Sequence, residues 1–303
     1  MFLIYGVTVF CAGIRSILTK QNGKINGSAS LFNFTRAFSA FVLFGVLALI
    51  SGFKIHFPTL LYGVAYGILF FGSCFCGFRA MQRGPLGITS SLVAFSLVIP
   101  CVIGTVFFEE TIGVFDVVGF ILVAVAIVMM NRKKHAVSHH GTSSYHEEVK
   151  KDEKQPKFKK GWWIYVLGTI VCDGFHATIK TLHQRSYPGS YRYEFMCTGM
   201  LIGAVAFIFL MIKNRRIIKE RGKERGAKCV VYGAIAGIAN GVYNYLVLYL
   251  AGTESAMALF PIVSVATIAI GLLSGWIIFK ERLNKMQICG VLIAAIAIFF
   301  IKI

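Results

Sequence analysis

The chain has 303 residues, of which 56% are hydrophobic and only 15% are charged. Soluble domains carry about 25% charged residues, so the composition excludes a soluble domain, and its apolar content excludes a disordered or fibrous chain. The 31 Lys and Arg outnumber the 13 Asp and Glu, which gives a formal net charge of +18. Such an excess suggests nucleic acid in a soluble protein, but it records orientation in a membrane protein.

Apolar segments recur along the chain at the length of transmembrane helices, which need about 20 apolar residues each. We predict ten, at residues 2–19, 30–51, 58–78, 87–107, 114–130, 162–181, 192–212, 229–250, 256–279 and 286–301. Strands of a membrane barrel would alternate polar and apolar residues, whereas these segments are apolar on all sides. The predicted fold class is therefore an all-α integral membrane protein.

Residues 131–160 differ from the rest because they contain almost no large apolar side chains. We predict a disordered basic linker between two five-helix halves, residues 1–130 and 161–303. The linker holds four of the seven histidines, His135, His139, His140 and His146. A solvated linker is favoured over a metal site there, and we expect no metal and no cofactor. The eight cysteines lie in or beside apolar segments and lack disulfide spacing, so we expect small buried hydrophobes.

The positive charges are unevenly placed. Residues 131–160 contain nine Lys and Arg, residues 213–228 contain eight, and the odd-numbered connections together hold 24 of the 31. Lys and Arg mark the cytoplasmic side of short membrane loops. The count predicts that residues 131–160 and 213–228 are cytoplasmic and that both termini lie outside, with the chain in the cell (plasma) membrane. These cations are then expected to attract anionic lipid head groups rather than nucleic acid.

The two halves repeat a common pattern. Tyr62-Gly63, Cys11-x-Gly13, Phe108, Glu110 and Gly119 match Tyr232-Gly233, Cys172-x-Gly174, Phe279, Glu281 and Gly290, at offsets of 170, 161 and 171. Each half has five spans, an odd number, so the second half enters the membrane from the opposite side. Inverted repeats of this kind are typical of alternating-access transporters, whose substrate site lies near the midplane between the repeats.

These motifs resemble the drug/metabolite transporter superfamily in its ten-helix EamA-type branch. The resemblance rests on Ala80, Gly84-Pro85, Pro100, Phe108-x-Glu110 and Gly119 in the first half, and on Ala251-Gly252, Pro261, Phe279-x-Glu281 and Gly290 in the second. It covers nearly the whole chain apart from the linker. It implies a carrier of small metabolites, often an exporter, with helices 1, 3, 4, 6, 8 and 9 lining the cavity. Well-studied members mostly place both termini in the cytoplasm, opposite to the charge count.

Charged side chains inside the spans cost about 2.5–3.5 kcal/mol each on insertion scales, which makes each one a candidate for function. Asp173 and His176 share one face of the sixth span, and a carboxylate beside an imidazole can exchange protons near neutral pH. We therefore consider both as proton-coupling residues. The structural alternative is an ion pair between Asp173 and Arg15 or Arg36. Lys180 continues the same stripe, but its position near the helix end predicts that it snorkels to the interface.

The predicted substrate cavity also receives polar residues from three other spans. Arg15 is the repeat counterpart of His176, Arg36 has a planar fork that suits a carboxylate, and two amides and a phenol share a face of the eighth span, where interhelical hydrogen bonding is the alternative role. The complete set is Arg15, Asn33, Arg36, Asp173, His176, Asn240, Tyr243 and Asn244. Three cationic or potentially cationic groups face one acid, which favours a carboxylate-bearing, amino-acid-like solute.

We therefore predict a secondary-active transporter of a small metabolite, working by alternating access in the direction of efflux, with protons as the candidate coupling ion. The expected partners are the solute and the lipid bilayer, and the sequence leaves the oligomeric state open. The alternatives are a membrane-embedded enzyme and a non-transporting sensor or scaffold. The sequence contains no HExxH, GxSxG or phosphate-loop motif and no paired carboxylates in its spans, so we do not expect an enzyme.

Overall fold

The computed structural model describes residues 1–84, 86–108, 113–131, 159–213, 215, 223–280 and 283–302, and within these ranges every regular element is helical. The first half contains α1 (Phe2–Lys24), α2 (Ala29–Ile50), α3 (Phe57–Arg83), the continuous series α4 (Leu86–Ala94), η1 (Phe95–Leu97) and α5 (Val98–Phe108), and α6 (Val114–Asn131). The second contains α7 (Trp162–Ser186), α8 (Arg192–Lys213), α10 (Lys223–Leu250), α11 (Ala256–Phe279) and α12 (Lys285–Lys302). The all-α prediction is confirmed, with a helical segment at each of the ten predicted spans.

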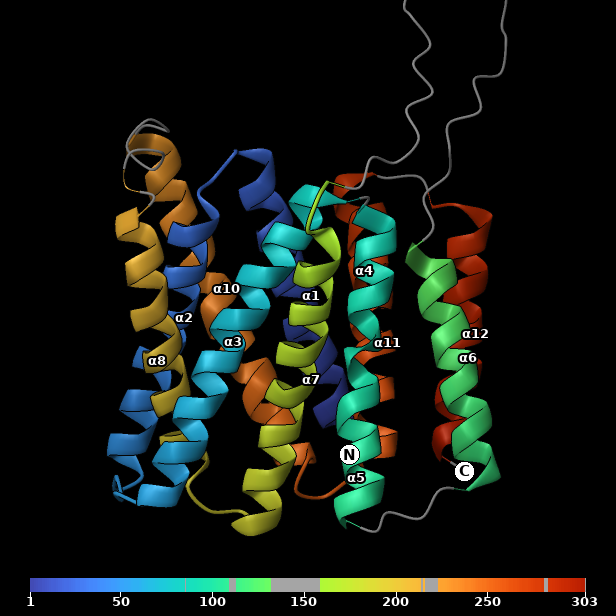
Figure 1. Ribbon diagram of the computed structural model, residues 1–303, viewed down its shortest axis with the longest axis horizontal. Coiled ribbons are helices and arrows are strands. Elements are labelled where there is room, and N and C mark those ends of the chain that lie inside the picture. The colour runs from blue at the N-terminus through green and yellow to red at the C-terminus, as the bar shows by residue number, and fades with distance from the viewer. Residues whose placement is uncertain are drawn as a thin grey trace, which may run out of the picture.

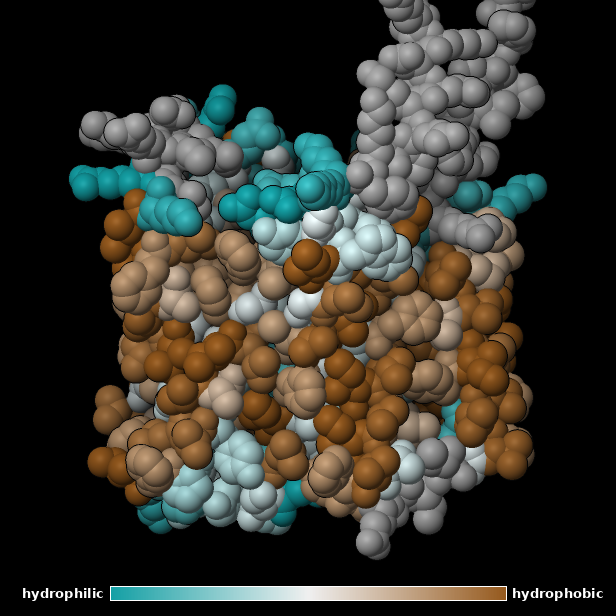
Figure 2. All heavy atoms as spheres, in the orientation of Figure 1, coloured by the Kyte–Doolittle hydropathy of each residue, from teal (hydrophilic) through white to brown (hydrophobic). Residues whose placement is uncertain are grey.

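Eight of these segments are long and apolar enough to cross a membrane. The exceptions are α12, which is short, and α7, whose hydropathy is lowered by Asp173 and His176. The surface carries a broad hydrophobic band between two hydrophilic ends (Figure 2). Many large apolar side chains in that band are exposed, such as Phe209 at 70% and Ile164 at 73%, which fits a surface solvated by lipid rather than water.

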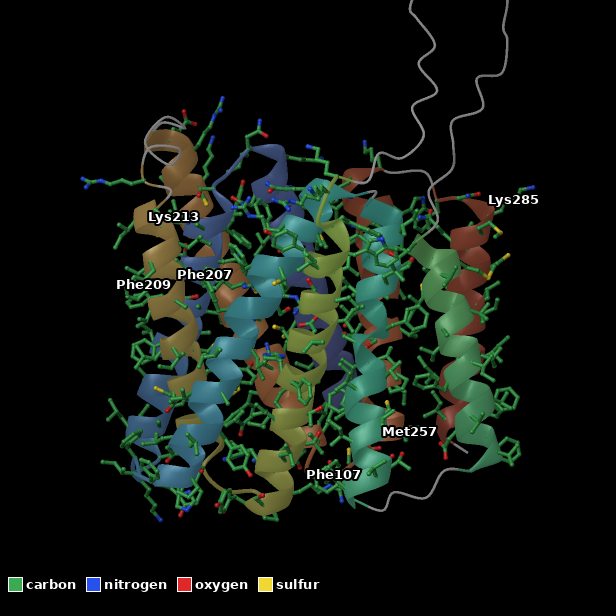
Figure 3. The ribbon with its side chains drawn as sticks, viewed as in Figure 1. Phe107, Phe207, Phe209, Lys213, Met257 and Lys285 are labelled. Atoms are coloured by element: carbon green, nitrogen blue, oxygen red, sulfur yellow. The ribbon has the colours of Figure 1, made fainter. Side chains whose placement is uncertain are left out.

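The two halves run in opposite directions through this band. Both chain termini lie toward one end of the bundle, while α6 ends and α7 begins at the other (Figure 1). We call the second end the linker side and the first the terminus side. Lys213 and Lys285 lie toward the linker side, and Phe107 and Met257 toward the terminus side (Figure 3). The first half therefore starts from the terminus side and the second from the linker side, as an inverted repeat requires.

Glycines that match between the halves make matching helix contacts. A Cβ on Gly63 would meet Thr198 and Phe195 of α8, and one on Gly233 would meet Thr35 and Phe32 of α2. These contacts relate α2 to α8 by an offset of 163. Gly119 likewise faces Ile301 and Ala297, and Gly290 faces their counterparts Met130 and Ala126. The glycine stripe on α10 therefore packs inside the monomer, because small residues let two helices approach closely.

The fourth span is interrupted where it meets the interior. Pro100 lies in α5 and cannot donate a backbone hydrogen bond to residue 96, and the helix tightens to a 3₁₀ turn at η1 just before it. Pro261 lies inside α11. Each proline sits beside a serine, Ser96 and Ser264, that faces the interior cavity described below.

The glycine contacts give a stability prediction. Gly67→Ala and Gly237→Ala should each cost about 1–3 kcal/mol of unfolding free energy, because the new methyl group would overlap backbone atoms of α8 or α2. Gly271→Ala in α11, where a Cβ would have no atom within 4 Å, should leave stability unchanged or raise it. Thermal unfolding of the purified variants measures the difference. Equal unfolding midpoints for all three would show that these helices do not pack as described.

Candidate functional site

The interior of the bundle contains a cavity of about 480 Å³. Its walls come from both halves: α1, α2, α3 and the α4–η1 segment from the first, and α7, α10 and α11 from the second. The six helices expected from the family resemblance all contribute, and α2 contributes in addition. A cavity between inverted halves is where transporters of this architecture bind their substrates.

All eight residues that the sequence singled out lie on the wall of this cavity. They are Arg15, Asn33, Arg36, Asp173, His176, Asn240, Tyr243 and Asn244. Residues far apart in the chain are thus brought together at one cavity, and their role in binding a solute is the subject of the proposal below. Ser96 and Ser264 also face the cavity, whereas the hydroxyl of Ser90 donates to Asn131 Oδ1 of α6.

Asp173 is held by a hydroxyl group. The Ser73 Oγ donates a hydrogen bond of 2.6 Å to one carboxylate oxygen of Asp173 and so links α3 to α7. Among the described residues, no cation lies within the 4.0 Å of an ion pair with Asp173, so the ion pair with Arg15 or Arg36 that was considered above is not formed. No hydrogen bond joins Asp173 to His176 in these residues either, although both face the same cavity.

Arg15 reaches from α1 to the polar face of α10. Its guanidinium donates to Asn240 Oδ1 at 3.3 Å, and its Cζ lies 4.7 Å from the centre of the Tyr243 ring. The Nδ2 atom of Asn240 is buried without a hydrogen-bond partner. A buried amide donor without a hydrogen-bond partner is costly in a protein interior. The Nδ2 atom of Asn240 is therefore expected to face a space that a ligand or water fills.

Lys180 corrects the sequence interpretation. It does not snorkel to the interface: it is only 4% exposed, lines the cavity, and donates a hydrogen bond of 3.1 Å to Asn244 Oδ1. Asn244 in turn donates through Nδ2 to the Asn240 carbonyl, so α10 orients its own amide toward the ammonium group. The stripe of Asp173, His176 and Lys180 along α7 was the signal for this position, because residues at i, i+3 and i+7 share a helix face.

Arg36 and His176 complete the polar lining. Arg36 donates to the Cys74 Sγ at 2.9 Å and lies 5.2 Å from the Phe70 ring centre, while its Nε is buried without a partner. His176 stacks on Tyr66 with ring centres 4.3 Å apart, and its Nε2 is also unpartnered. Each group is therefore positioned by an aromatic ring and retains a free polar atom.

The balance of charge in the cavity is positive. Arg15, Arg36 and Lys180 are three cations against the single carboxylate of Asp173. Unpaired charge in a low-dielectric interior is unfavourable, and an anionic ligand would reduce that cost. Sequence reasoning missed Ser73, Cys74 and Phe70, which position the charged groups, because such residues are unremarkable in an apolar helix.

The cavity opens toward the linker side. There its wall includes Thr19 and Met81, which are exposed. At the terminus side its wall is made of the buried Val247, Phe260 and Val263. Among the described residues, the exposed part of the cavity wall thus lies toward the linker side and the buried part toward the terminus side, which is the geometry that alternating access requires.

Aromatic contacts fasten α8 to α10 at the terminus side. The rings of Tyr193 and Tyr245 stack with centres 5.3 Å apart, and the Arg192 guanidinium lies 4.6 Å from the centre of the Tyr249 ring. Such contacts contribute about 0.5–1.5 kcal/mol each beyond the burial of their area.

No cluster of three or more His, Cys, Asp or Glu suited to a metal ion occurs in the part of the chain that the structure describes. The four linker histidines, like Pro85, Glu110 and Glu281 of the family motifs, lie outside the described residues.

The fold and cavity define a class: an inverted-repeat helical membrane transporter. Comparison with known proteins agrees, since the profile of the EamA-like transporter family matches residues 2–132 and 161–303. The chain belongs to this family and is a membrane transporter of small solutes. A solved structure titled only "Crystal structure of protein" superimposes with a TM-score of 0.70 at 11% identity, over 98% of this chain and 94% of the other, which shows the shared fold. The comparison with curated proteins gave no match.

The surplus of positive charge predicts that small dicarboxylates such as succinate stabilise the protein against heat, and that diamines of similar size do not. Lys180→Met should weaken this binding about tenfold, because it removes a cavity cation while keeping the length of the side chain. Lys54→Met, in the exposed connection before α3, is the matched control and should bind like the wild type. Identical shifts of the unfolding midpoint for K180M and wild type would contradict the assignment.

Proposed function

We propose that the protein is a secondary-active transporter of a small organic anion, such as a carboxylate-bearing, amino-acid-like metabolite. The observation that carries this proposal is the one-sided cavity between the two halves, with three cations and one acid on its wall. Arg15 and Arg36 are suited to bind the carboxylate, since a guanidinium donates two parallel hydrogen bonds to it. The amides of α10 and the free Nε2 of His176 would hold other polar groups of the solute.

Transport would proceed by alternating access. In this conformation the solute reaches the cavity from the linker side, and rocking of one half against the other would expose the cavity to the terminus side instead. Solute binding can drive this change only to the extent that it differs between the two states. Groups that link α10 to α1 and α7 are well placed for this, because a bound anion would compete for their donors.

The orientation we propose puts the linker side in the cytoplasm of the cell membrane and both termini outside. It is supported by the described basic residues, most of which cluster at the linker side, such as Lys213, Lys228 and Lys285. A cavity open to the cytoplasm would load its solute there, which favours efflux. In the alternative classes, an enzyme would need a nucleophile or a catalytic pair in the cavity, and a scaffold would need no cavity at all.

The orientation has a direct test. Epitope tags at either terminus should be labelled by antibody on intact cells, whereas a tag inserted in residues 131–160 should be labelled only after the membrane is permeabilised. Western blotting of all three tagged proteins controls for expression. The reverse pattern would overturn the orientation and, with it, the direction of transport that we propose.

For coupling, we propose that Asp173 carries the transported proton and that His176 assists. Asp173 lies near the middle of α7 on the cavity wall, where an ionised carboxylate is costly and where protonation is linked to the charge of the solute. Ser73 holds the carboxylate and would stay bonded to it in both protonation states, because a hydroxyl both donates and accepts.

Asp173→Asn should therefore abolish the dependence of solute flux on an imposed pH gradient in reconstituted vesicles. Exchange of labelled for unlabelled solute, which needs no net proton movement, should persist in the variant. The matched control is Asp116→Asn, in the first turn of α6 and outside the cavity lining, which should behave like the wild type. If D173N moved the same solute with the same pH dependence as the wild type, the coupling role would be wrong.

A further inference from the structure

A second pocket, of about 230 Å³, lies beside the central cavity at the linker side. It is formed where the start of α2 and the ends of α3 and α8 meet, and we call it the side pocket. Its lining is Ser28, Ala29, Ser30, Asn33, Cys74, Phe75, Phe78, Arg79, Gln82, Phe207 and Leu210. Asn33, Cys74 and Phe78 also line the central cavity, so the two spaces share a wall.

The inverted repeat supplies a filled copy of this pocket. The offsets fixed by the glycine contacts, 163 between α2 and α8 and 170 between α3 and α10, place Tyr193 opposite Ser30 and Tyr245 opposite Phe75. In the filled copy the Tyr193 ring stacks on Tyr245 at 5.3 Å and 3°, and Phe44, the counterpart of Phe207, stacks on Tyr245 at 5.9 Å. The same space is therefore packed with aromatic rings at the terminus side.

The side pocket is vacant because its residues are smaller, and no displacement of helices is needed to explain it. The first half has Ala29, Ser30 and Asn33 where the second half has Arg192, Tyr193 and Met196. A space of this size loses the contacts that its lining atoms would otherwise make. In the filled copy the Tyr193 ring makes these contacts. In the side pocket they would be restored by an aromatic ring that lies on Phe75 with Phe207 beside it.

The polar groups of the side pocket favour a negatively charged ligand. Arg79 contacts only an aromatic ring, with its Cζ 5.6 Å from the centre of Phe75, and neither Asn33 nor Gln82 has a hydrogen-bond partner among the described residues. Gln82 and Arg79 lie in the last turns of α3, nearest the linker side, while Phe75 and Cys74 lie deeper. A ligand with one anionic end and one aromatic end would satisfy both regions at once.

We propose that the side pocket binds an aromatic carboxylate, with its ring stacked on Phe75 and its carboxylate held by Arg79. This goes beyond the proposed transport by adding a second binding site that shares a wall with the central cavity. It rests on the proposed function only in identifying the bound anion with the transported solute. Binding itself is measured without any flux.

The test fills the pocket with the side chain of its own counterpart. Ser30→Tyr should raise the unfolding midpoint and weaken benzoate binding at least about tenfold, because the new phenol occupies the space of the ligand ring. Arg79→Gln should weaken benzoate binding similarly and leave the binding of benzyl alcohol unchanged. Val205→Tyr, at an exposed position of α8 that lines neither space, is the control for bulk and should keep benzoate binding in the side pocket.

Occupancy is read from Cys74, which faces both spaces, and location from Arg79, which lines only the side pocket: protection of Cys74 that is lost in Arg79→Gln places benzoate there. A negatively charged methanethiosulfonate reagent forms a mixed disulfide with this thiol and releases methanesulfinate. Benzoate should slow the reaction at Cys74 and not at Cys76, which lies on neither wall and contacts α7 at Gly168. The reaction at Cys74 is best followed in a variant whose other cysteines are replaced, with Cys76 kept for comparison. If that variant does not fold, the rate at Cys74 is obtained from intact masses, as the labelling of the wild type minus the labelling of Cys74→Ala.

The outcomes separate the alternatives. If benzoate does not protect Cys74 and its binding does not depend on Arg79, the proposal is wrong, whatever the transport assays show. The anion could also be a lipid head group, so the measurements are made in vesicles of phosphatidylcholine with and without phosphatidylglycerol. Protection by phosphatidylglycerol alone would assign the pocket to lipid and overturn the proposal. Benzoate protection in a protein that moves no solute would contradict the proposed function and leave the site intact.

Discussion

The structure depends on holding charged side chains inside a helix bundle whose outer surface is hydrophobic and suited to lipid. Four ionisable side chains, from α1, α2 and α7, face one interior cavity, and each is held by a neutral partner rather than by an opposite charge. An ion pair would satisfy the charges permanently and leave nothing for a solute to do. Neutral hydroxyl, amide and thiol partners lower the cost of burial while leaving the net charge of the cavity positive.

The packing of the helices follows the twofold symmetry of the repeat, whereas the charged residues do not. Matching glycines pack against matching residues throughout, down to Gly13 against Ile270 and Gly174 against its counterpart Ile99. The charged residues break this rule, because Asp173 and Lys180 correspond to Ala12 and Thr19. Arg15 corresponds to His176, and each contacts an equivalent position, Asn240 or Phe70. The duplicated packing thus sets where the helices meet, and the charges on α7 are what the second half does not share with the first.

Much of this could be predicted from the sequence because the bilayer constrains it so strongly. Span length, the inverted repeat and the eight cavity residues all follow from apolar periodicity and from the cost of polar groups in hydrocarbon. The prediction for Lys180 was wrong because its distance from the helix end suggested snorkelling, whereas Asn244 on another helix offered a buried acceptor. That pairing depends on how α7 and α10 meet.

The side pocket was equally invisible to sequence reasoning. Ser30 and Ala29 are ordinary small residues at the start of a helix, and nothing in their pattern marks a vacancy. Only the alignment of α2 on α8 in space shows that Tyr193 and Arg192 occupy the equivalent volume. A cavity forms where the surrounding side chains are too small to fill a space, and a single sequence does not show how large that space is.

The contacts of α10 connect binding to movement. Asn240 and Asn244 hold cations from opposite halves, Arg15 from α1 and Lys180 from α7, so this one helix links both sides of the cavity. An anion that binds Arg15 and Lys180 takes donors away from both amides and replaces two neutral acceptors with one charged acceptor, which makes stronger hydrogen bonds. On the proposed function, occupancy of the cavity would therefore weaken the links from α10 to its neighbours. The helix face that carries both amides is, for this reason, where a bound anion would change the balance between the two proposed conformations.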